Sequence, residues 1–324
     1  MNKKMLSHII ALGTFVIFVI LGLASATMPS YTEWRDAHIG SKSTAENHTS
    51  GRTAENCLYN GWYLYKNKRY NEAINDFSEA IYLTPNHPLP FYLRGDAYYA
   101  INNYDAAISD YSQALRLYSN RPIPPYPYIN FMNLGTGSTS GAFSYSLGDG
   151  SSMGNFSFSK ILSSRGWAYN LKGDYDSAVA DYTECIRIDP SISLYNNRGL
   201  IYHNKKDYDR AISDFTEAIK AATYRVNMNS NSNTHNELKR CYYNRGWSYH
   251  NKGDYDMAIE DYTQALRLVS NDAALFNRRG LSFEKKKTYY QAVSDFTQAV
   301  RLDPVNTEYG ANLERVKQLQ GNSR

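Results

Sequence analysis

The sequence predicts an all-α fold, a solenoid of six stacked helix–turn–helix repeats closed by a C-terminal capping helix. The first observation is a glycine that returns about every 34 residues once two insertions are set aside, as Gly61, Gly95, Gly166, Gly199, Gly246 and Gly280. The second is a pattern that follows each glycine: a small residue, an aromatic residue four positions later, and a second small residue three positions after that. Such a period indicates an array of small units rather than one large domain.

The pattern behind each glycine belongs to the second helix of its repeat. The aromatic residues are Phe77, Tyr111, Tyr182, Phe215, Tyr262 and Phe296. Offsets of four and three residues bring the aromatic residue and the two small residues onto one face of a helix, which we expect to pack against the first helix. Pro85, Pro190 and Pro304 stand where three of these helices should end, because proline is common just past a helix.

The first helix of each repeat contains the glycine, and a short turn joins it to the second helix. In two repeats this turn reads Lys-Gly-Asp-Tyr-Asp, at 172–176 and 252–256. Glycine suits the turn, and aspartate is favoured at the positive N-terminal end of the next helix. After the last repeat, Tyr309 and Val316 recur at helical spacing within 307–324, which predicts a helix that caps the array.

These features resemble the tetratricopeptide repeat family across residues 54–121, 159–225 and 239–306. In that family small residues at these positions let two antiparallel helices approach closely, while the aromatic residue fills the gap beside them. The resemblance implies a right-handed superhelix whose concave groove is lined by the first helices and binds a protein or peptide partner. It is specific for the fold and nearly silent about which partner is bound.

The N-terminus has the order of an export signal. Lys3 and Lys4 precede an uncharged, largely apolar stretch that ends in three small residues at 24–26, which is typical of a secretory signal cleaved after Ala26. Residues 5–26 are also long enough to span a bilayer, so an uncleaved membrane anchor stays open as the alternative. Both interpretations place the rest of the chain outside the cytoplasm, either periplasmic, in the cell envelope or secreted, or anchored in a membrane.

Three further segments lie outside the repeats, and the first of them, 27–53, is predicted to be a linker. In the Pro-, Gly- and Ser-rich insertion 122–158, apolar residues alternate with serines around Phe143 and Tyr145, so a hairpin and a mobile loop both stay open. The Asn- and Ser-rich insertion 226–238 is predicted to be a plain linker. Both insertions fall at junctions between repeats, so we expect them to project from one side, and the first to be removable without loss of the fold.

Charge and segment length exclude several classes of function. The formal net charge of +4 at pH 7 is too weak to favour a nucleic-acid partner. No segment outside the repeats is long enough for a catalytic domain, so we expect neither an enzyme nor a cofactor. His203 and His250 stand at equivalent places in adjacent repeats but lack a third ligand, so the sequence predicts no metal site.

Two rows of opposite charge run through the repeats. The arginines Arg94, Arg165, Arg198, Arg245 and Arg279 each precede the glycine, and the aspartates Asp110, Asp181, Asp214, Asp261 and Asp295 each precede the aromatic residue of the second helix. An arginine row would suit an anionic ligand. Because one aspartate matches one arginine in repeats two to six, we predict charge pairing within each repeat instead.

The candidate binding residues lie on the first helices, around the repeated glycine. Directly after it stand Trp62, Asp96, Trp167, Leu200, Trp247 and Leu281. One turn later come Tyr65, Tyr99, Asn170, His203, His250 and Glu284, and one turn earlier Tyr92, Asn196, Asn197, Tyr243, Asn244, Asn277 and Arg278. Tryptophan offers a large contact area, and asparagine both donates hydrogen bonds to an extended backbone and accepts them from it. We therefore predict a peptide-binding groove here. The alternative, in which these aromatic residues pack between neighbouring repeats, stays open.

Some members of the family grip a carboxyl terminus with Lys, Asn and Arg on consecutive first helices. Asn197, Asn244 and Arg278 fit parts of such a clamp, but tryptophan or leucine stands where it needs an asparagine. The predicted function is therefore a non-catalytic, exported scaffold that binds a peptide segment, with membrane association through residues 5–26 if they are retained. The alternatives are a self-assembling homo-oligomer and an accessory subunit of an envelope complex.

Overall fold

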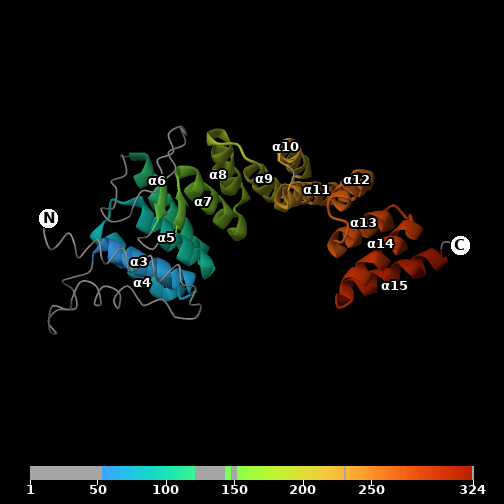
Figure 1. Cartoon of the computed structure of the whole chain (residues 1–324), viewed down its shortest axis with the longest axis horizontal. Coiled ribbons are helices and arrows are strands. Elements are labelled where there is room, and N and C mark those ends of the chain that lie inside the picture. Colours follow the sequence, from blue (N-terminus) through green and yellow to red (C-terminus); the bar gives the residue numbers. More distant parts are fainter. Residues whose placement is uncertain (1–52, 121–142, 147–151, 230, 323–324) are drawn as a thin grey trace, which may run out of the picture.

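The computed structural model describes residues 53–120, 143–146, 152–229 and 231–322, and the helices of these ranges follow one another in pairs. The pairs are α3 (Ala54–Lys66) with α4 (Tyr70–Leu83), α5 (Pro88–Ala100) with α6 (Tyr104–Asn120), α7 (Phe158–Lys172) with α8 (Tyr175–Ile188), α9 (Ile192–Asn204) with α10 (Tyr208–Met228), α11 (Ser232–Lys252) with α12 (Tyr255–Leu268), and α13 (Ala273–Lys285) with α14 (Tyr289–Leu302). A single helix, α15 (Thr307–Asn322), packs on α14. Figure 1 shows the pairs stacked into an elongated, curved array with α3 and α15 at opposite ends. The predicted helical solenoid is confirmed.

Within each repeat the glycine of the first helix lies against the aromatic ring of the second. A Cβ atom added at Gly61 would lie 2.6 Å from Cε1 of Phe77, and one added at Gly95 would lie 2.7 Å from Cε1 of Tyr111. The six aromatic residues of this set are at most 2% exposed. Glycine is therefore needed here because the ring occupies the space that a side chain would take.

The turn between the two helices places one residue in the left-handed backbone region. In repeats three and five this residue is Gly173 or Gly253, with φ of 86° and 98°. The other four repeats place Lys68, Asn102, Lys206 and Lys287 there, with φ between 60° and 65°. A side chain in this region costs roughly 1 kcal/mol relative to glycine, so the turns with lysine carry strain that repeats three and five avoid.

The arginine and aspartate rows are paired, as predicted, and each arginine also reaches the preceding repeat. In the pairs Arg94–Asp110, Arg165–Asp181, Arg198–Asp214, Arg245–Asp261 and Arg279–Asp295, Nε and Nη2 donate to the two carboxylate oxygens at 2.7 to 2.9 Å. The remaining Nη1 donates at 3.0 Å to a hydroxyl on the second helix of the preceding repeat, that of Ser78, Ser112, Thr183, Thr216 or Thr263. The arginine row therefore links each of repeats two to six to the repeat before it.

The first insertion contains the hairpin that the sequence left open. Strands β1 (Phe143–Ser146) and β2 (Ser152–Phe156) pair antiparallel. Phe156 is only 2% exposed, and its ring centroid lies 5.5 Å from those of Tyr92 and Tyr118. Ser157 then caps α7 by accepting a hydrogen bond from the backbone N–H of Lys160 at 3.1 Å. The prediction that all of 122–158 is dispensable is therefore wrong at its C-terminal end, whereas 122–142 and 147–151 lie outside the described residues.

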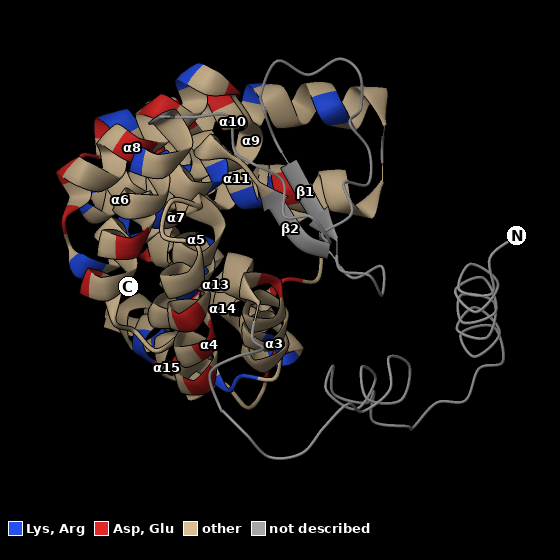
Figure 2. Cartoon of the chain, turned by 90° about the vertical axis from the view of Figure 1, so that its left-hand side faces the viewer, with Lys and Arg blue, Asp and Glu red and all other residues tan. Residues whose placement is uncertain are grey.

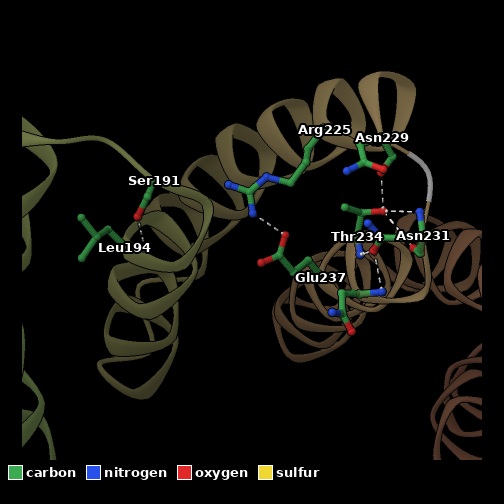
Figure 3. Close-up of polar contacts among 8 residues, drawn as sticks. Ser191, Leu194, Arg225, Asn229, Asn231, Thr234 and Glu237 are labelled. Atoms are coloured by element: carbon green, nitrogen blue, oxygen red, sulfur yellow. Dashed lines mark hydrogen bonds and ion pairs between the residues drawn. The ribbon is translucent and has the colours of Figure 1, made fainter. Parts of the chain in front are cut away.

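The second insertion is mostly helical, and the prediction of a plain linker across 226–238 is wrong. Helix α10 continues to Met228 and α11 begins at Ser232, so each helix extends beyond its repeat. Figure 3 shows the turn between them, where the Asn231 side chain accepts from the backbone N–H of Thr234 at 3.0 Å and the Thr234 hydroxyl accepts from the Asn231 N–H at 3.1 Å. This capping box stabilises the start of α11, so a helix forms here although the polar composition favours a linker.

Charges of both signs are interspersed over the helices (Figure 2). On the side shown, the described helices present no broad basic face of the kind that a nucleic acid would contact. Across the described ranges no helix is both long and apolar enough to cross a membrane. The predicted export signal or anchor lies in residues 1–52, outside the described part of the chain.

Candidate functional site

The first helices of the repeats line the inner side of the curved array. Neighbouring first helices approach one another, α3 with α5, α5 with α7, α9 with α11, and α11 with α13. In Figure 1, α8 and α10 lie along the outer edge of the arch, with α7 and α9 beneath them. We call the first-helix residues named above, directly after the repeated glycine and one turn before and after it, the concave surface.

Three asparagines of the predicted groove are buried between helices. The Nδ2 of Asn244 donates to Oδ1 of Asn196 at 2.8 Å, and the Nδ2 of Asn312 in α15 donates to Oδ1 of Asn277 at 2.9 Å. A buried amide needs a hydrogen-bond partner within the protein, and these amides satisfy one another between successive helices. We therefore correct the interpretation of Asn196, Asn244 and Asn277, which join the array together and offer no amide to a peptide.

The two histidines of the predicted groove also bond to the next first helix. Nδ1 of His203 lies 2.8 Å from Oγ of Ser248, and Nδ1 of His250 lies 2.8 Å from Oγ of Ser282. Burial lowers the pKa of His203 to about 4, and the nearby charge of Arg278 acts in the same direction. Burial lowers the pKa of His250 as well. Both rings are thus neutral parts of the packing, and the described residues hold no cluster of three metal-ligating side chains.

Trp247 is covered by side chains of the neighbouring repeats. Its ring centroid lies 3.9 Å from that of His203. The guanidinium of Arg278 lies over the indole, 5.8 Å from the centroid, and also hydrogen-bonds to the side chain of Tyr243. These contacts support the alternative that this tryptophan fills space between repeats.

Asn197 and Leu200 are half-buried on α9 and keep part of their surface on the concave side. The Nδ2 of Asn197 donates weakly to Oη of Tyr182, at 3.4 Å. In repeat five the corresponding tyrosine, Tyr262, is buried and its hydroxyl has no hydrogen-bond partner among the described residues. The reason is that Arg278, which stacks on tryptophan, stands at the position that Asn197 occupies in repeat four.

Trp62 and Trp167 lie half-buried on α3 and α7, in the N-terminal half of the concave surface. Nζ of Lys66 lies 5.1 Å from the ring centroid of Trp62, and the indole of Trp167 donates a hydrogen bond to the side chain of Tyr99. In the described part of the chain no aromatic ring stacks on either indole, in contrast to Trp247. These two tryptophans are therefore the better candidates for contact with a partner.

Asp96 stands between the two tryptophans in the column of residues that follow the glycine. Oη of Tyr111 donates to its Oδ1 at 2.6 Å, and the hydroxyl of Tyr92 also hydrogen-bonds to it. Tyr92 itself is buried, with its ring centroid 5.9 Å from that of Tyr111 and 5.5 Å from that of Phe156. In the sequence, the signal for Asp96 is a charged residue in a column of tryptophan and leucine.

An open depression of about 560 Å³ adjoins the concave surface where α11 extends beyond its repeat. Tyr243, Arg240 and Leu275 belong to its lining. Lys239 and Asp272 pair with each other within it, Nζ to Oδ2 at 3.0 Å. The depression lengthens the concave surface past Tyr243, and the sequence does not predict it because the extension of α11 has the composition of a linker.

Comparison with family models identifies repeats of one kind along the chain. Models described as "Tetratricopeptide repeat" match residues 159–192, 192–222, 240–272, 88–121 and 273–306, and a model described as "TPR repeat" matches 63–101. Together these matches cover more than half of the sequence. A search of curated proteins found no match to this chain.

Solved structures similar to this chain include a TPR repeat-containing protein. A chain of the APC/C hetero-tetramer Cut9-Hcn1 matches with a TM-score of 0.50 and 19% identity, over 82% of this chain but only 42% of its own length. The C-terminal part of a TPR repeat-containing protein from Cytophaga hutchinsonii matches with a TM-score of 0.55 and 17% identity, over 80% of this chain and 84% of its own. At these identities the likeness shows the fold alone.

Proposed function

This chain belongs to the tetratricopeptide repeat family, and from that premise we propose that it is a non-catalytic scaffold that binds a peptide segment of a partner protein on its concave surface, outside the cytoplasm. Repeats of this family are protein-interaction modules, which supports a protein partner. The observation that carries the proposal is the pair of half-buried indoles, Trp62 and Trp167, on the inner side of the array. Large aromatic residues on a concave surface are typical anchors for a bound segment.

The residues that remain available support a binding surface at the N-terminal half of the array. The asparagines and histidines of repeats four to six are bonded to neighbouring helices, whereas Trp62, Tyr65, Tyr99 and Trp167 are half-buried side chains around one stretch of first helices. A non-catalytic role is supported by the repeats themselves, because tetratricopeptide repeats generally serve as scaffolds. The export signal predicted from residues 1–26 is the reason to propose a partner outside the cytoplasm.

Truncation of the tryptophans tests the binding proposal. Trp62→Ala and Trp167→Ala are expected to weaken association with partners captured from intact cells by about thirtyfold, since an anchoring aromatic residue contributes about 2 kcal/mol or more. Tyr290→Ala is the matched control, because this exposed aromatic residue lies on the second helix of its repeat, α14. Capture that is unchanged by either tryptophan variant, in protein that still folds, would refute the proposed surface.

The proposed location has a separate test. N-terminal sequencing of the native protein should begin at Thr27 if the signal is cleaved, and an uncleaved chain should fractionate with membranes and expose its repeats outside the cytoplasm. A soluble cytoplasmic protein that begins at Met1 would contradict both versions of the proposal.

A further inference from the structure

Asp96 is the one charged residue in the column that directly follows the repeated glycine. The other repeats place Trp62, Trp167, Leu200, Trp247 and Leu281 there. Asp96 is half-buried on α5, and its carboxylate is oriented by hydrogen bonds from the hydroxyls of Tyr111 and Tyr92. The hydroxyl of Tyr92 also hydrogen-bonds to the side chain of Ser164 of the next repeat. Side chains of repeats two and three therefore hold this carboxylate in place.

The carboxylate of Asp96 has no cationic partner among the described residues. The aspartates that precede the aromatic residue in repeats two to six each pair with an arginine, for example Asp110 with Arg94 at 2.7 Å. Asp96 forms no such pair, and Lys160 acts on it only at longer range. Burial raises the pKa of Asp96 to about 6, against the opposing effect of its tyrosine hydrogen bonds and of Lys160. A half-buried carboxylate without a counter-ion is an unfavourable arrangement unless a cation is supplied from outside.

Aromatic residues stand at the position of Asp96 in the preceding and following repeats. Trp62 and Trp167 occupy the equivalent positions on α3 and α7. The charge of Asp96 also acts on Tyr65 of α3 and Tyr99 of α5, which places both near it. The faces of such rings attract cations, and Lys66 of this chain already lies over Trp62. Aromatic faces around a carboxylate form a receptor for a positively charged group.

We propose that Asp96, with Trp62 and Trp167, receives the lysine or arginine side chain of a partner segment. The inference rests on the proposed function, because it assigns the chemistry of one residue in the segment that the concave surface binds. A cation completes the charge of Asp96, whose carboxylate retains acceptor sites beyond the two tyrosine bonds. An apolar side chain would leave this charge stranded, and an acidic one would be repelled by it.

Degenerate heptapeptide pools with one fixed central residue test the proposal on the full chain. The pools carry Lys, Arg, norleucine, Gln or Glu at the centre, so that only the central group differs. We expect the Lys and Arg pools to bind at least tenfold more tightly than the norleucine pool. Asp96→Asn should abolish that preference while its amide oxygen still accepts from Tyr111. Asp189→Asn, which removes the same charge from an exposed position, should leave the preference unchanged.

The pH dependence of peptide binding provides a second test of the proposed cation site. The groups that face Asp96 are the hydroxyls of Tyr111, Tyr92, Tyr65 and Tyr99 and the ammonium of Lys160. The pKa values of the four tyrosines are raised, so none of these hydroxyls ionises near neutral pH. Binding of the Lys pool should therefore weaken about tenfold from pH 7 to pH 5, as Asp96 takes up a proton with a pKa of about 6. The norleucine pool should not change.

Two outcomes would overturn the inference. Equal binding of the Lys and norleucine pools, unaffected by Asp96→Asn, would show that the surface binds peptides without reading a cation, and the proposed function would stand. Failure of every pool to bind would also reject the cation site. In that case the capture experiment with Trp62→Ala and Trp167→Ala decides the proposed function on its own.

Discussion

Arg245→Ala should destabilise the array because it strands a buried charge. Nε and Nη2 of Arg245 bond to Asp261 at 2.9 and 2.8 Å, and Nη1 bonds to Thr216 of the preceding repeat at 3.0 Å. Asp261 is 2% exposed, so the variant leaves its carboxylate buried without a counter-charge, at a cost of about 3–5 kcal/mol. The lost bond to the threonine adds about 1 kcal/mol.

The expected loss depends on pH. Burial already raises the pKa of Asp261 with Arg245 present, and removal of the arginine should raise it further. A carboxyl whose pKa is raised in the folded state contributes stability while it is protonated, and that contribution is lost as the pH rises through the folded pKa. The difference between Arg245→Ala and the wild type should therefore be smaller at pH 5 than at pH 8.

Arg187→Ala is the matched control for this measurement. Arg187 also makes two bonds to one carboxylate, that of Glu184 at 2.8 and 2.6 Å, but its side chain is 71% exposed. An exposed pair of this kind contributes little to the free energy of unfolding, because water screens both charges. Urea unfolding followed by circular dichroism gives the comparison. Hydrogen exchange in α11 and α12 locates the loss, because a repeat array need not unfold in one step.

Equal destabilisation by Arg245→Ala and Arg187→Ala would refute this reasoning. It would mean that Asp261 gains access to solvent when its partner is removed, so that no buried charge remains. The double variant Arg245→Met with Asp261→Leu separates charge from packing. Replacing both partners with apolar residues should recover most of the lost stability.

Three further predictions concern packing, the first insertion and titration. Gly61→Ala should cost about 1–3 kcal/mol in a denaturant melt because its Cβ would lie 2.6 Å from a buried ring, whereas Gly310→Ala, with no atom within 4 Å, should cost nothing. Phe156→Ala should lower the free energy of unfolding by about 3–5 kcal/mol, whereas replacement of 122–142 by a short Gly-Ser linker should leave the melting temperature nearly unchanged. A stable Phe156→Ala variant together with an unstable linker variant would contradict the assignment of this phenylalanine to the core. The pKa of Asp96 is raised to about 6, so its contribution to stability is complete below pH 3.8 and is lost as the pH rises through 6. Thermal melts from pH 4 to 7 should show a loss of about 3 kcal/mol at most that Asp96→Asn does not show.

The pairing of the two charged rows could be predicted because both recur at the same place in each repeat. A one-to-one match between Arg245 and Asp261 needs no knowledge of how repeats are stacked. The third bond, to Thr216, was not predictable, since it depends on the distance between second helices of successive repeats. The extended α11 was missed for a different reason: its first turns are rich in Asn and Ser, which favour a linker until a helix cap and an ion pair between Arg225 and Glu237, at 2.8 Å, hold them in place.

Local pattern was enough to establish the helices, their pairing and the repeat, because each depends on neighbours about 34 residues apart or closer. Local pattern did not determine the burial and contacts of the concave residues. Asn197 and Asn244 stand at the same place in successive repeats, yet one is half-buried and the other is buried against Asn196. Amphipathic spacing shows which face of a helix looks inward. Whether that face contacts solvent or the next first helix depends on the curvature of the array. This curvature arises from packing between whole repeats, so the sequence of a single repeat does not determine it.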